Sequence, residues 1–124
     1  MRRAHRIRRL WLLGLFGLLL PAACALGSRG LYRQSVVKSK EAVLREELWI
    51  LRDSIQEFHE RHQTYPRKLQ DLVAEGYVHW VPVDPMTNSA DTWIMKDASD
   101  GQGIADVRSG AEGKTNEGTL YSDF

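Results

Sequence analysis

The chain of 124 residues contains a single cysteine, and no acidic residue occurs before Glu41. Because Cys24 stands alone inside an apolar run, the sequence excludes a disulfide framework and a zinc site built from several cysteines. Five arginines lie among the first nine residues. The net charge of +1 therefore hides a strong division of charge along the chain.

The distal half of the chain is acidic. From Leu69 onward three basic residues stand against ten acidic ones. Binding of nucleic acid needs a basic surface that displaces counterions. We therefore expect no nucleic-acid partner, whereas this half is compatible with cations.

An apolar run from Leu10 to Leu26 follows the arginines. Its seventeen residues span roughly 26 Å as a helix, a little less than a bilayer core of about 30 Å. Arginines of this kind stay on the cytoplasmic side and direct the rest of the chain outward. We expect a single-pass anchor in residues 1–30 that includes Leu10, Trp11, Leu15, Leu18 and Leu20.

Two other fates of this segment stay open. A secretory signal peptide has the same order of a basic region, an apolar region and a small-residue site such as Ala23-Cys24-Ala25. The run Leu20-Pro21-Ala22-Ala23-Cys24 also resembles the lipobox of bacterial lipoproteins, in which the cysteine is lipidated. All three versions export the remaining residues, 31–124.

A long amphipathic helix is predicted next. Its apolar positions recur at helical spacing and form one stripe: Val37, Leu44, Leu48, Leu51, Ile55 and Phe58. The helix is expected to run from about Ser35 to Gln63 and to end before Pro66, because the residue preceding a proline is pushed out of the α region. A helix on the order of 40 Å in so short a chain acts as a spine, and the second half must cover its stripe.

One short helix and three short strands are predicted in the second half. Pro66 suits the first turn of the helix, and Gly76 ends it. The turn dipeptide Asp100-Gly101 joins two strands. The expected strands are Thr92–Lys96, Gly103–Ser109 and Thr119–Tyr121. The predicted fold class is α+β, with a small antiparallel sheet packed on the spine.

The large aromatic residues and the Pro82–Pro85 turn give further expectations. Trp80 and Trp93 are expected to cap the core between helix and sheet, since a tryptophan buries some 200 Å². Trp49 lies just off the apolar stripe and is expected to cover its edge. Asp84 is expected to accept backbone hydrogen bonds in a rigid turn.

No catalytic motif is recognised. His59 and His62 are separated by two residues, unlike the H-E-x-x-H of zinc proteases, and no third ligand lies near them in sequence, so we expect solvated histidines. Ser109-Gly110 lacks the G-x-S-x-G nucleophile elbow. We expect neither an enzyme nor a small-molecule substrate.

An ordered series of stretches resembles the major pseudopilins of type II secretion and the related type IV pilin-like proteins. These stretches are Lys40–Leu48, Leu51–Ile55, Tyr65-Pro66, Leu69–Val73, Gly76–Val78, Val81–Pro85, Asp106–Gly110 and Gly118–Phe124. The resemblance covers roughly residues 36–124 and implies a pilin-like fold. One departure from the family pattern is clear. Where the family has its peptidase cleavage site and a glutamate, this chain has Arg8-Arg9-Leu10-Trp11-Leu12.

The resemblance implies a structural, non-catalytic part or accessory of a type II secretion or type IV pilus-like machine. Its partners would be the bacterial inner membrane and other pilin-like subunits, with helices packed together near Val36, Val37 and Leu44. The C-terminal domain would lie in the periplasm or outside the cell. The alternative is a lipoprotein anchored through Cys24, or a periplasmic binding module, that keeps the fold and does not assemble.

The resemblance also implies a calcium ion in the loop between the last two strands. That loop is Ser109–Thr119. Calcium takes six to eight oxygen ligands from carboxylates and carbonyls. The expected ligands are Glu112 and Glu117, with Asp123 at the border of the loop.

Overall fold

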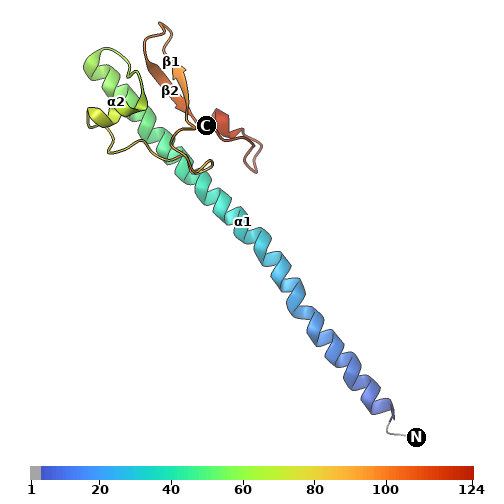
Figure 1. The fold of residues 1–124 in the computed structure, drawn as a ribbon. Helices are drawn as coiled ribbons and strands as arrows, with labels where there is room; N and C mark the ends of the chain where they lie inside the picture. The colour runs from blue at the N-terminus through green and yellow to red at the C-terminus, as the bar shows by residue number, and fades with distance from the viewer. Residues whose placement is uncertain (1–3) are drawn as a thin grey trace. The chain divides into compact units, whose positions relative to one another are not determined.

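A computed structural model describes the backbone of residues 4–124 and the side chains of residues 29–124. The elements in chain order are helix α1 (Ala4–His62), helix α2 (Leu69–Ala74), strands β1 (Ile94–Asp97) and β2 (Ile104–Arg108), and the 3₁₀ helix η1 (Tyr121–Asp123) (Figure 1). The chain is therefore α+β, as predicted. It divides into two compact units, Met1–Lys38 and Ser39–Phe124, and α1 contributes to both.

The first unit is the N-terminal part of α1. Leu31 and Tyr32 are 71% and 72% exposed. The predicted anchor residues and the predicted lipidation site lie outside the described side chains: Leu10, Trp11, Leu15, Leu18, Leu20 and Cys24. Among residues 29–124, whose side chains the structure describes, no helix combines the length and the apolar character needed to cross a membrane.

The core of the second unit lies along one face of α1. Leu44, Leu48, Leu51 and Ile55 are each at most 1% exposed, and Phe58 packs against them. The predicted stripe is confirmed at these positions, and Val37, in the first unit, is half-buried. Leu44 was also expected to seat a partner helix, which is wrong because its side chain is fully enclosed by its own domain. The covering residues come from the second half: Leu69, Leu72, Trp93, Ile104, Val107 and Tyr121.

Helix α1 ends where the sequence predicts. Gln63 has a positive φ of 56° and its N–H donates to the His59 carbonyl at 2.8 Å, while its side chain donates to the Glu60 carbonyl. These bonds satisfy carbonyls that the helix leaves without partners. The chain then turns back along α1.

Helix α2 is shorter than predicted at its N-terminal end. Pro66 is buried ahead of the helix, and its carbonyl accepts a hydrogen bond of 2.8 Å from the Ile104 N–H. Asp71 accepts bonds from the N–H groups of Arg67 and Lys68 and so caps the first turn. Gly76, with φ 79°, ends this segment as expected.

The sheet has two antiparallel strands, with Met95 opposite Val107. Ile104 and Val107 of β2 face the core, whereas all four residues of β1 are exposed. The predicted third strand at Thr119–Tyr121 is wrong. The Lys114–Leu120 pair forms an isolated bridge within its own loop, and the chain then enters η1.

The three tryptophans among residues 29–124 have different environments. Trp93 is buried, and its indole N–H donates a 2.8 Å hydrogen bond to the Pro82 carbonyl. Trp80 is 70% exposed, so its expected role in the core is wrong, because Tyr77 and Val78 of the same segment pack there instead. Trp49 is 63% exposed and does not cover the edge of the apolar stripe.

Candidate functional site

The loop predicted to bind calcium is closed by its own hydrogen bonds. The hydroxyl of the buried Thr115 accepts bonds from the N–H groups of Glu117 and Thr119. Glu112, Glu117 and Asp123 are exposed, and within the described residues no three His, Cys, Asp or Glu side chains gather as ligands for a metal. Calcium binding stays a prediction of the resemblance.

The two histidines near the end of α1 pack on aromatic rings. His59 stacks on Tyr65, with ring centroids 4.0 Å apart and planes 5° apart. His62 lies against Phe58 at 4.3 Å, and its Nε2 atom is 3.8 Å from a carboxylate oxygen of Glu75. The two imidazoles thus have separate neighbours.

An arginine on α1 holds two segments of the second half, strand β2 and the C-terminal residue. The Arg52 Nε atom is 2.9 Å from Asp106 Oδ1, and its Nη2 atom donates to the carbonyls of Val107 and Phe124. The planar guanidinium serves several acceptors at once, which a lysine does not. This role was not predicted from the sequence, where Arg52 enters only as part of the stretch Leu51–Ile55 that carries the resemblance.

The Asp84 turn is attached to the end of β2. Asp84 Oδ1 accepts hydrogen bonds from the N–H groups of Met86 (2.8 Å) and Thr87 (3.4 Å), which confirms the predicted turn chemistry. Its Oδ2 atom accepts a bond of 2.6 Å from the Ser109 hydroxyl, and both side chains are fully buried. Ser109 is therefore a structural partner of this turn.

A tyrosine of η1 forms a hydrogen bond with a carboxylate of α1. Tyr121 donates from its hydroxyl to Glu41 Oε1 at 3.0 Å, and both residues are about 6% exposed. Burial, the hydrogen bond to Glu41 and the charge of Glu41 raise the pKa of Tyr121 above its usual value. Glu41 lies one turn before Leu44 and continues the buried face with a polar residue.

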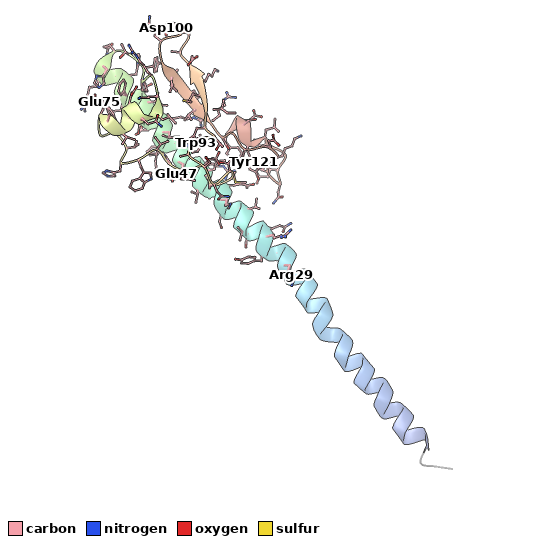
Figure 2. The ribbon with its side chains drawn as sticks, viewed as in Figure 1. Arg29, Glu47, Glu75, Trp93, Asp100 and Tyr121 are labelled. Atoms are coloured by element: carbon pink, nitrogen blue, oxygen red, sulfur yellow. The ribbon has the colours of Figure 1, made fainter. Side chains whose placement is uncertain are left out.

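An open apolar groove lies between α1 and residues 77–82. Its volume is about 280 Å³, and Glu47 and Ile50 line it from α1. The other lining residues are Tyr77, Val78, His79, Trp80 and Pro82. Partial burial, followed by the neighbouring charge of Glu46, raises the pKa of the Glu47 carboxyl. Figure 2 labels Glu47 on the part of α1 that carries the second unit, together with the buried Trp93 and Tyr121.

Comparison with protein-family models, with curated proteins and with solved structures finds no match to this chain. The functional argument therefore depends on the arrangement itself. Three polar contacts, made by Arg52, Asp84 and Glu41, fasten the second half of the chain on itself and on α1. The groove between α1 and residues 77–82 is open to a partner.

Proposed function

We propose that this protein is a non-catalytic structural subunit or accessory of a membrane-anchored pilin-like assembly, of the type II secretion or type IV pilus kind. The observation that supports the proposal most directly is that a small α+β domain is built on the C-terminal part of a helix of 59 residues. A helix of that length exceeds what the domain itself needs, because among residues 29–62 of α1 the first buried side chain is that of Glu41.

The charge and hydropathy of the N-terminal segment support the same proposal. The five arginines and the apolar run Leu10–Leu26 suit a segment inserted in the bacterial inner membrane with the arginines inside. The domain would then lie in the periplasm or outside. Within that frame a pilin-like fold, other pilin-like subunits as partners and a calcium ion in the Ser109–Thr119 loop are further parts of the proposal.

The test is the recovery of the full-length protein from native membranes with a mild detergent, followed by mass spectrometry. We expect a retained N-terminal segment and co-isolation of other subunits that consist of a long helix and a small C-terminal domain. Val36→Glu, on the exposed part of α1, is expected to reduce this co-isolation. Ile94→Glu, at an exposed apolar position of β1, serves as the matched control.

The open groove favours a second candidate function. An anchored binding module that does not assemble would use the groove for its ligand. In that case the protein would be recovered without pilin-like subunits, and a chain starting at a lipidated Cys24 would make assembly into a filament untenable.

A further inference from the structure

Two exposed surfaces on this chain carry opposite, unpaired charges. Within residues 29–124, Glu46 and Glu47 form no ion pair, and Arg29 and Arg33 form none either. The nearby basic residues of the second unit are engaged: Lys40 donates to Asn88, Arg52 pairs with Asp106, and Arg45 lies over the Phe124 ring at 4.7 Å. The acidic side of the groove therefore forms no ion pair with a basic residue of its own domain.

The basic surface is one face of α1, which we call the Arg29–Val36 face. It consists of Arg29, Tyr32, Arg33 and Val36, which follow the spacing i, i+3, i+4, i+7 and so share a side of the helix. Tyr32 is 72% exposed and Val36 38%. Helices that dock into grooves place their anchor residues at this same spacing.

The groove offers the complementary groups. Trp80, 70% exposed, presents an indole ring on which an arginine can lie, an arrangement favoured by the ring quadrupole. Glu47 stands at the same groove, and Glu46 precedes it on α1. Ile50, Val78 and Pro82 supply apolar lining for a tyrosine or valine.

We propose that the Arg29–Val36 face of one copy of this chain docks into the Glu47–Trp80 groove of a second copy. The occupant follows from charge complementarity, because the groove is acidic and aromatic while the face is basic and apolar. The contact joins two different surfaces, so it is heterologous, and repeated copies extend it into an open row rather than a closed pair. This inference rests on the proposed function and names the partner of that assembly.

The test places a photocrosslinking residue on the face of the full-length protein. Benzoylphenylalanine replaces Tyr32, and ¹⁵N-labelled and unlabelled protein are mixed in mild detergent before irradiation. We expect a crosslinked dimer in which a labelled peptide with position 32 is joined to an unlabelled peptide from residues 77–82. The same probe at Trp49, an exposed position on the same helix, is expected to give no crosslink to residues 77–82.

Charge exchange provides the second measurement. Glu47→Lys and Arg33→Glu are each expected to lower the yield of crosslinked dimer about tenfold, because each places like charges together. The double variant is expected to restore the yield. Circular dichroism of each variant checks that the domain has kept its fold.

The proposal is overturned by crosslinks within one copy only, by crosslinks between the two positions 32, by crosslinks to a different protein, or by no crosslink. If the copies fail to join but the protein still co-isolates with pilin-like subunits, this docking is wrong and the proposed function stands. If neither association is found, both are wrong.

Discussion

Ser109 donates a hydrogen bond of 2.6 Å to Asp84 Oδ2, and the two side chains are fully buried although 25 residues separate them in sequence. The other oxygen of Asp84 accepts from the N–H groups of Met86 and Thr87. One carboxylate thus holds its own turn and also attaches that turn to the end of β2. A buried carboxylate needs these donors, because an unsatisfied charge in the interior is costly.

Ser109→Ala removes one donor from this carboxylate. We expect the free energy of unfolding to fall by about 1–3 kcal/mol, the range for leaving a buried polar group unsatisfied. Urea titration followed by circular dichroism measures the change. Ser99→Ala, an exposed serine in the turn after β1, is the control and is expected to change stability by less than about 0.5 kcal/mol. Equal urea midpoints for the two variants would show that the hydrogen bond between Ser109 and Asp84 does not contribute to stability.

Arg52→Lys tests whether the shape of the guanidinium matters. A lysine keeps the charge but cannot serve Asp106 and the carbonyls of Val107 and Phe124 together. Because the side chain is partly exposed, we expect a moderate loss of about 1–2 kcal/mol in unfolding free energy.

The control for Arg52 is Arg61→Lys on the same helix. Arg61 is 3.7 Å from Glu57 in an exposed i,i+4 pair, and such pairs contribute about 0.3–0.5 kcal/mol. We expect its thermal midpoint to match that of the unmodified protein. If Arg61→Lys lost as much stability as Arg52→Lys, the structural role assigned to the Arg52 guanidinium would be wrong.

Trp93 and Trp80 form a matched pair of substitutions. Trp93→Phe removes the indole N–H that bonds to the Pro82 carbonyl and leaves a void in the core, so we expect a loss of about 1–3 kcal/mol in chemical denaturation. Trp80→Phe changes an exposed ring and is expected to be neutral within about 0.5 kcal/mol. The reverse order of the two losses would contradict the assignment of Trp93 as the core residue.

The features predicted correctly from sequence are those with a local cause. The buried stripe on α1 follows from the spacing of Leu44, Leu48, Leu51 and Ile55, because a helix places residues three and four apart on one side. The hairpin follows from its turn dipeptide, and the Asp84 turn follows from the flanking prolines. Each signal lies within a few residues of the structure it specifies.

The missed features depend on contacts between distant segments. Nothing near Trp80 in the sequence distinguishes it from Trp93, and it is the Trp93 indole whose N–H meets the Pro82 carbonyl in the folded chain. A third strand was predicted at Thr119–Tyr121, but hydrogen bonds to Thr115 and Gly113 close that segment on itself. The burial of Glu41 was not predicted, since its partner Tyr121 lies 80 residues further along the chain.

The Glu41–Tyr121 contact predicts a dependence of stability on alkaline pH. The pKa of Tyr121 is raised above 10.0 in the folded protein, first by burial and then by the hydrogen bond to Glu41 and the charge of that residue. Above pH 10 the unfolded chain releases this proton while the folded protein retains it, so the folded state binds more protons and its stability falls as pH rises. The slope from this one group is at most about 1.4 kcal/mol per pH unit.

Tyr121→Phe removes the titrating group and isolates this effect. At pH 8 we expect the variant to be less stable by about 1–2 kcal/mol, because Glu41 stays buried without its donor. Between pH 10 and pH 11 the difference should shrink, since only the unmodified protein carries the tyrosine slope. Tyr32→Phe, at an exposed position, should follow the unmodified protein throughout. Urea midpoints at half-unit steps of pH measure both comparisons, and a constant difference between the unmodified protein and Tyr121→Phe from pH 8 to pH 11 would mean that Tyr121 does not hold its proton against the Glu41 carboxylate.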